Sequence, residues 1–416
     1  MNRPRRMQLV VAVAVSAVLV AAACSGDDDA GGGAAGGSEN AAAVDEETTA
    51  APVPEEFTGT DEEFYEVPEP LEEGEPGELI RVQTLGEQDG ATTVRVMYHS
   101  VDGQDRDRAV TGLITYPSDA SAAPEDGWPV LSWAHGTSGL GPRCAPSRAG
   151  GEAPAFGIDG VRVATDYIGL GPVGERHPYL SGPSEGHSVI DGVRAARRLP
   201  DAHAGERWVA VGHSQGGHAA LFANQLGEEY APELDLRGTA ALAPGAALDK
   251  TFGPSDQLVA RMVGVMALYG MAEDNPDIDP ADYVGPEVAA KADVIDTGCL
   301  QDIVDAFLPI PEDTFYTVDP LDDPAAREVL EANDPGHVAV DSPLLLVYGT
   351  ADATVVPERM AYFIDQLCEV GQVTETIESE GADHGTVVTQ DGAAITDWLN
   401  DRLAGEPAPD SCPAGD

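Results

Sequence analysis

Ser214 lies in a G-x-S-x-G pattern that spans residues 212–216. Residues 207–211 have the apolar character of a short buried strand, and residues 216–225 are predicted as a helix rich in small residues. The serine therefore falls at a strand-to-helix turn, which strains its backbone and exposes its hydroxyl, while the flanking glycines remove side chains that would collide there. The pattern predicts a nucleophilic serine.

A serine hydroxyl becomes an effective nucleophile when a histidine takes its proton, and that histidine needs a carboxylate to fix its tautomer. At this type of turn the chain order is Ser, then Asp or Glu, then His. Asp352 follows an apolar strand predicted at 344–349, and His384 is the one histidine of nine that comes after Asp352. We therefore expect Asp352 to be the acid and His384 the base. His213 and His218 flank the serine, but such a turn directs neighbouring side chains away from it, so we interpret both as structural.

The charge that forms on the substrate carbonyl needs hydrogen-bond donors. The N–H of Gln215 is expected to supply one, because it begins a helix whose positive dipole end faces the substrate. The second is expected from the loop after a predicted strand at 128–134, with Thr137 or Gly136 as the donor.

The elements that must position these residues alternate between strands and helices. The first strands alternate apolar and polar residues, which indicates an antiparallel edge, and the later ones are continuous apolar runs, which indicates burial on both faces. Together they predict an α/β fold with a mostly parallel central sheet covered on both faces. The predicted strands are 78–83, 91–101, 108–116, 128–134, 160–164, 207–211, 236–243, 344–349 and 372–377, and the predicted helices outside the insert are 188–199, 216–225, 357–368 and 392–403.

Five segments are expected along the chain. Residues 246–341 interrupt the alternation with helical patches and Pro- and Asp-rich connections, and we interpret them as a helical cap inserted over the edge of the sheet where substrates bind. The core is then divided into 78–245 and 342–412, preceded by a signal peptide at 1–24 and an acidic tether at 25–77.

The N-terminal segments indicate export. Residues 1–24 contain three arginines, an apolar run and then Cys24, which is the layout of a bacterial signal peptide. Residues 21–24 resemble a lipoprotein signal, in which the cysteine is lipidated. Residues 25–77 are acidic with few large apolar side chains, which predicts a solvated tether. We expect an extracytoplasmic protein, either anchored to the cell membrane by lipid on Cys24 or secreted.

The charge and the cysteines narrow the function classes. The formal net charge is −51, and in residues 81–416 there are 55 acidic against 19 basic residues, which leaves −36 on the body. This charge disfavours nucleic-acid binding and suggests a saline habitat, with an acidic soluble surface as the alternative. Besides Cys24, the cysteines are Cys144, Cys299, Cys368 and Cys412, an even number that is compatible with two disulfides after export. None has C-x-x-C spacing, so we do not expect zinc or redox chemistry. A serine mechanism of the kind predicted above implies neither a metal nor an organic cofactor.

Five short stretches carry a resemblance to a known family: residues 144–147, 166–171 and 212–217, the loop of Asp352 and the turn of His384. Together they resemble the secretory lipase family, the fungal lipase A type and its actinobacterial relatives, over about residues 80–412. The resemblance implies an α/β-hydrolase fold with a helical lid inserted before the strand of the acid. It also implies hydrolysis of carboxylic esters, from short acyl esters to triacylglycerols.

By position, the resemblance makes Ser214 the nucleophile, Asp352 the acid and His384 the base. It also suggests that Cys144 pairs with Cys299 and Cys368 with Cys412, one of three possible connectivities. The sequence thus predicts an exported, monomeric serine hydrolase that acts on small-molecule or lipid esters. Two alternatives remain at this point: a serine aminopeptidase of the same fold, and a surface binding protein without catalysis.

Overall fold

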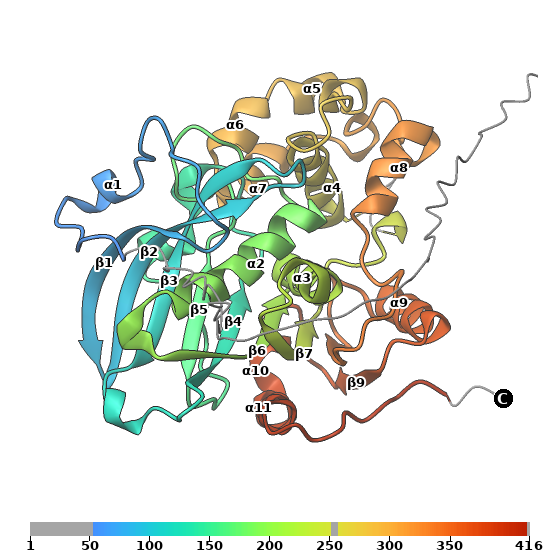
Figure 1. Ribbon diagram of the computed structural model, residues 1–416. Coiled ribbons are helices and arrows are strands. Elements are labelled where there is room, and N and C mark those ends of the chain that lie inside the picture. The colour runs from blue at the N-terminus through green and yellow to red at the C-terminus, as the bar shows by residue number, and fades with distance from the viewer. Residues whose placement is uncertain (1–52, 251–256, 414–416) are drawn as a thin grey trace, which may run out of the picture. The chain divides into compact units, whose positions relative to one another are not determined.

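A computed structural model describes residues 53–250 and 257–413 of the chain (Figure 1). Within these residues, nine strands form one sheet in the order β1-β2-β3-β5-β4-β6-β7-β8-β9. β1, β2 and β3 pair antiparallel, as does β3 with β5, and every later neighbour pair from β5 to β9 is parallel. The strands are β1 (Leu79–Gln88), β2 (Ala91–Val101), β3 (Asp107–Pro117), β4 (Trp128–Ala134), β5 (Val161–Thr165), β6 (Ala204–His213), β7 (Asp235–Leu242), β8 (Leu344–Gly349) and β9 (Thr374–Ser379).

The central strands are buried on both faces, as their continuous apolar runs predict. Successive residues of a strand point to opposite faces. In β6, Trp208 and Ala210 belong to the core cluster that includes α2 (Gly182–Arg197) and α3 (Gln215–Tyr230). Val209 and Val211 belong to the cluster that includes α11 (Gly392–Leu403). The sheet therefore has helices on both faces, as Figure 1 shows.

A group of helices lies between β7 and β8 and is drawn in yellow to orange in Figure 1. They are α4 (Leu258–Met271), α5 (Pro286–Ala289), α6 (Ala292–Thr297), α7 (Leu300–Phe307) and α8 (Pro324–Ala332). A hydrophobic cluster holds this cap, in which Met262, Val265 and Met266 of α4 are buried together with Phe307, and Tyr179 and Leu180 of the loop before α2 join it. These side chains stabilise the cap itself, because an apolar helix face gains free energy by burial.

The remaining helices follow β8 and β9. α9 (Pro357–Val370) comes after the loop of Asp352, and the short α10 (Val387–Gln390) comes after the turn of His384. α9 begins with a proline, which suits the first turn of a helix, and ends at Gly371, which adopts the left-handed conformation (φ 81°) that stops a helix.

The acidic tether was predicted to reach residue 77, and the structure differs over its last part. α1 (Asp61–Phe64) lies against the outer strands, and the rings of Phe64 and Tyr65 are buried there. The guanidinium of Arg95 lies over both rings and pairs with Asp61 at 3.0 Å. The prediction was wrong for this part because averaging composition over the whole acidic stretch hid the aromatic residues that anchor it.

Two disulfides join distant parts of the chain. Cys144 bonds to Cys299 and connects a core loop to the cap, and Cys368 bonds to Cys412 and fastens the C-terminal segment to α9. This is the pairing that the family resemblance suggests.

The predicted signal peptide and Cys24 lie outside the described residues. Over residues 53–250 and 257–413, no helix combines the length and apolar character needed to cross a bilayer.

Candidate active site

Ser214 stands between β6 and α3 with backbone angles of φ 58° and ψ −118°. This conformation is strained for a residue with a side chain, so the surrounding packing must hold it. A Cβ on Gly212 would lie 1.9 Å from the carbonyl oxygen of Gly216, and a Cβ on Gly216 would lie 1.9 Å from that of Ala134. Both glycines of the pattern are therefore sterically required at this turn.

The structure brings Ser214, His384 and Asp352 together. Nε2 of His384 lies 2.9 Å from Oγ of Ser214, and Nδ1 lies 2.8 Å from Oδ2 of Asp352. These distances fit an imidazole whose Nδ1–H donates to the carboxylate and whose Nε2 accepts from the hydroxyl. The side chain of Asp352 is fully buried, whereas that of His384 keeps 23% of its surface exposed. The carboxylate is thus shielded from water, while the imidazole is accessible from outside.

The loop after β8 fixes the carboxylate of Asp352. Its Oδ1 accepts hydrogen bonds from the N–H groups of Thr354 and Val355, at 2.7 and 2.8 Å, which leaves Oδ2 for His384. Burial acts to raise the pKa of Asp352, but the hydrogen bond and charge interaction with His384, together with the two N–H groups, hold this pKa below its usual value. Asp352 is therefore an ionised acceptor at neutral pH.

The turn that carries His384 is held from two sides. Oδ1 of Asp383 accepts hydrogen bonds from the N–H groups of Gly385 and Thr386, at 3.1 and 2.8 Å. On the other side, Nε2 of His213 donates to the carbonyl oxygen of His384 at 2.7 Å. Because a carbonyl oxygen only accepts, this contact fixes the proton of His213 on Nε2. His213, interpreted from the sequence as structural, thus supports the backbone of the base.

The residues expected to bind the oxyanion lie around Ser214. Gln215 is the first residue of α3, so its N–H belongs to the first turn, which has no carbonyl partner within the helix. On the other side, a Cβ on Gly136 would lie 3.7 Å from the Cβ of Ser214. Thr137 follows, and its Oγ1 lies 2.8 Å from the hydroxyl of Tyr179. The loop after β4 and the start of α3 therefore meet at the serine.

A narrow cavity of about 30 Å³ lies over Ser214 and Gln215. Helix α4 of the cap contributes Val259 and Val263 to it, and most of the other lining side chains are apolar. Among the described residues that line the cavity, the charged one is Arg359, a cation. The cap thus covers the serine in this structure with an apolar surface.

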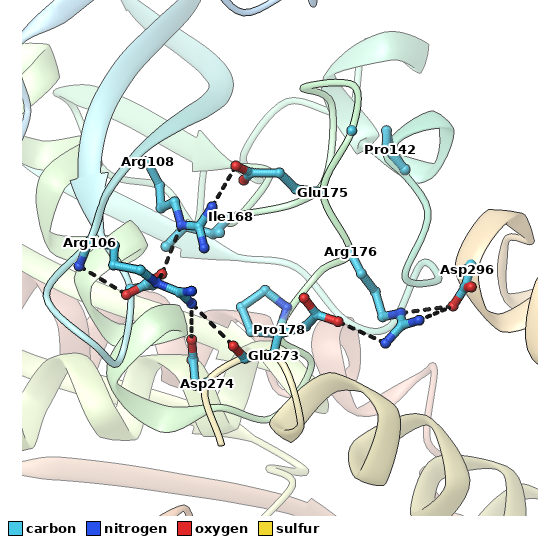
Figure 2. Close-up of a pocket in the computed structure, with 12 residues that line it drawn as sticks. Arg106, Arg108, Pro142, Ile168, Glu175, Arg176, Pro178, Glu273, Asp274 and Asp296 are labelled. Atoms are coloured by element: carbon cyan, nitrogen blue, oxygen red, sulfur yellow. Dashed lines mark hydrogen bonds and ion pairs between the residues drawn. The ribbon is translucent and has the colours of Figure 1, made fainter. Parts of the chain in front are cut away.

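A larger cavity of about 560 Å³ lies at the junction of core and cap, and Figure 2 shows its charged lining. Arg176 contacts two cap carboxylates, Glu273 at 2.7 Å and Asp296 at 2.6 Å. Arg108 contacts Glu175 at 2.6 Å. All the carboxylates of the described lining pair with arginines, so this cavity is an ion-pair junction between core and cap.

Sequence reasoning did not identify two polar residues beside the turn of Ser214, Glu185 and His177. Both side chains are fully buried, and both contact the side-chain amide of Gln215. A signal was present for Glu185, which lies four residues before Val189 and therefore on the stripe of α2 that packs on the sheet. An acidic residue on a buried stripe indicates a buried hydrogen-bond network. His177 lies in a loop and gave no such signal.

The strained serine turn, the parallel sheet and the helical cap define an α/β-hydrolase with a candidate serine-histidine-aspartate site. Comparison with solved structures agrees on the fold. The rice cell wall degrading esterase LipA from Xanthomonas oryzae is similar with a TM-score of 0.68 and 21% identity, over 79% of this chain and 100% of that chain. Candida antarctica lipase A in its closed state is similar with a TM-score of 0.67 and 17% identity, over 83% of this chain and 86% of that chain.

Residues 159–411, well over half of the chain, match the secretory lipase family. The chain belongs to this family and is a carboxylic ester hydrolase, as the sequence predicted. A secreted triacylglycerol lipase of Malassezia globosa is 24% identical over 383 residues, which cover 84% of this chain and 82% of the relative. A probable inactive lipase of Mycobacterium tuberculosis is 24% identical over 388 residues, which cover 84% of each.

Proposed function

We propose that the chain hydrolyses carboxylic esters through Ser214, His384 and Asp352. Oγ of Ser214 attacks the ester carbonyl while Nε2 of His384 takes the hydroxyl proton, and Asp352 orients the imidazole and stabilises its cationic form. His384 then gives the proton to the departing alcohol. A water molecule, activated by His384 in the same way, releases the acid from the acyl-enzyme.

The developing oxyanion is stabilised by the N–H of Gln215 and by a second N–H from the loop after β4, that of Thr137 or Gly136. Donors that are fixed before the reaction cost no reorganisation when charge develops. The observation that carries the proposal is the continuous chain of contacts from Ser214 Oγ through His384 to Asp352, at 2.9 and 2.8 Å. A relative described as a probable inactive lipase makes activity the first property to test.

The cavity lining supports an ester with an apolar acyl group. The cap surface over Ser214 includes Val259 and Val263, which can contact a hydrocarbon chain. An aminopeptidase of the same fold would need a carboxylate to hold the substrate amine, and the charged residue among the described lining is Arg359, a cation. The lining therefore favours an ester over a peptide with a free amino end.

The test measures hydrolysis of nitrophenyl esters, from acetate to palmitate, by the full chain and by its Ser214→Ala variant. We expect ester turnover that falls at least about 10³-fold in the variant, because the nucleophile is lost. The chain-length profile then distinguishes an esterase from a lipase. Turnover of aminoacyl nitroanilides with no ester turnover would indicate the peptidase. Absence of both, with no labelling of Ser214 by a fluorophosphonate, would indicate a binding protein.

We further propose that the protein works outside the cytoplasm, anchored by a lipid on Cys24. The signal-like sequence of residues 1–24 and the similarity to a secreted lipase support this location. When the chain is expressed with a labelled fatty acid in a bacterium that processes lipoproteins, we expect the label on the wild type and none on Cys24→Ser. A wild type that takes up no label would contradict the lipid anchor.

A further inference from the structure

A cluster of buried polar side chains surrounds the side-chain amide of Gln215. It consists of Glu185 on α2, His218 on α3 and His177 in the loop before α2, all fully shielded from solvent. Gln215 itself is 2% exposed. Burial of polar and charged groups is costly unless their hydrogen bonds are made, so a cluster of this kind keeps one arrangement.

The contacts of His218 define the charge state of the cluster. Its Nδ1 lies 2.7 Å from Oε2 of Glu185, and its Nε2 lies 2.8 Å from the carbonyl oxygen of Asn333 at the end of α8. Both neighbours offer acceptor oxygens, so each ring nitrogen is placed to donate a hydrogen bond. Burial acts to raise the pKa of Glu185, but the charge of His218 and the hydrogen bonds that the carboxylate accepts lower it to about 2. A buried carboxylate, hydrogen-bonded to His218, therefore lies beside the turn of Ser214.

The contacts of His177 and Glu185 fix the amide of Gln215. Nδ1 of His177 donates to the carbonyl oxygen of Ile168 at 2.8 Å, so its Nε2 is an acceptor. Nε2 of Gln215 lies 2.6 Å from that nitrogen and 2.7 Å from Oε1 of Glu185. The amide nitrogen of Gln215 is thus engaged by two buried side chains, while its buried Oε1 has no hydrogen-bond partner.

Glu185 links this amide to the wall of the substrate cavity. The same Oε1 accepts the N–H of Leu180 at 2.9 Å, and Leu180 lines the cavity over Ser214. Gln215 directly follows the strained Ser214 and carries the N–H proposed for the oxyanion. A strained backbone persists only where the surrounding structure holds it in place. Glu185 can hold the backbone of Gln215 through its hydrogen bond to the side chain of that residue.

We propose that Glu185 is a positioning residue for ester hydrolysis: through the side chain of Gln215 it holds the N–H of that residue in line with the oxyanion. This inference rests on the proposed function and adds a residue to it. Glu185 touches no substrate. Its effect is expected on stabilisation of the transition state, where a small displacement of a donor is costly, and much less on substrate binding.

The test compares Glu185→Gln in the full chain with the wild type, using active-site titration so that only folded enzyme is counted. A glutamine keeps the shape but cannot accept from both Gln215 and His218. We expect kcat to fall roughly tenfold or more with KM little changed. A trifluoromethyl ketone, which adds to Ser214 and places an oxyanion in the hole, should lose affinity by the same factor as kcat/KM.

Asp191→Asn is the matched control. Asp191 is also a fully buried carboxylate on α2. It accepts hydrogen bonds from Ser100, Arg194 and Tyr230, and not from Gln215. We expect this variant to lose stability and to keep the wild-type kcat and ketone affinity for each titrated site. This separates positioning of the oxyanion donor from general stabilisation of the helix.

Gln215→Met provides a second variant, because it removes the side-chain amide that Glu185 contacts and leaves the contact between Glu185 and His218 intact. It is expected to lower kcat and ketone affinity together, and it decides the matter if Glu185→Gln does not fold. Wild-type kcat and ketone affinity in a folded variant would overturn the inference while the ester hydrolase function stands. A wild-type chain that neither turns over esters nor binds the ketone would overturn both.

Discussion

His213 supports the backbone of His384, the proposed base. Its Nε2 donates to the backbone carbonyl of His384, and the two rings lie 4.7 Å apart. Burial and the neighbouring His384 lower the pKa of His213 to about 4, so the ring stays neutral at neutral pH and places no second cation beside the base. One hydrogen bond thus connects the residue before the nucleophile to the turn that carries the base.

We predict that His213→Phe lowers kcat by about fivefold, because a lost hydrogen bond of this kind is worth about 1 kcal/mol and leaves the carbonyl of His384 less well held. The measurement is kcat and KM for the best nitrophenyl ester, with thermal unfolding to check the fold. His213→Gln, which can still present an N–H to the carbonyl, is the control and should recover most of the loss. Equal activity in all three proteins would contradict a positioning role.

Sequence reasoning reached some residues of the candidate site and not others. Ser214, Asp352 and His384 could be chosen because each follows the carboxyl end of a strand, and those ends meet at one edge of a parallel sheet. The bond between His213 and His384 joins residues 171 positions apart and depends on how two loops approach each other. Glu185 was missed because the predicted helix began at residue 188, whereas α2 begins at Gly182, so its spacing from Val189 was not considered.

The same limit applies to whole elements. The central strands were predictable because continuous apolar runs bounded by turn residues are typical of strands buried on both faces. α1 was not predicted, because only four residues form it and its stability comes from burial of Phe64 and Tyr65 under Arg95, not from its own helical propensity. α2 begins at Gly182, earlier than the expected residue 188, because Ser184 and Glu185 are held in its first turns by tertiary hydrogen bonds.

The cap is joined to the core by one covalent and several ionic contacts. The disulfide from Cys144 to Cys299 closes a long loop, and such bonds are worth about 2–4 kcal/mol. The contacts of Arg176 with Glu273 and Asp296 are partly exposed, and pairs of this kind contribute about 0–1 kcal/mol each. The covalent link therefore dominates, and any movement of the cap away from Ser214 must leave the Cys144 end attached.

The whole molecule carries far more negative than positive charge. The net charge is −51, and −36 of it belongs to residues 81–416. The ion pairs at the core–cap junction engage arginines with carboxylates, but 19 basic residues cannot offset 55 acidic ones in that part of the chain. Self-repulsion among the remaining carboxylates opposes the compact state, and dissolved salt weakens it over distances beyond the Debye length.

We predict that raising NaCl from 0.01 to 1 M increases the melting temperature by roughly 5 °C, because the Debye length shrinks from about 30 to about 3 Å and long-range repulsion is lost. Salt also weakens the exposed ion pairs, but each of these contributes little, so the net effect should be stabilising. Differential scanning calorimetry in NaCl and in choline chloride of equal ionic strength measures this and separates screening from specific sodium binding, since screening gives equal shifts. A melting temperature that is highest near zero salt would mean that the local ion pairs outweigh the self-repulsion and would exclude adaptation to a saline habitat.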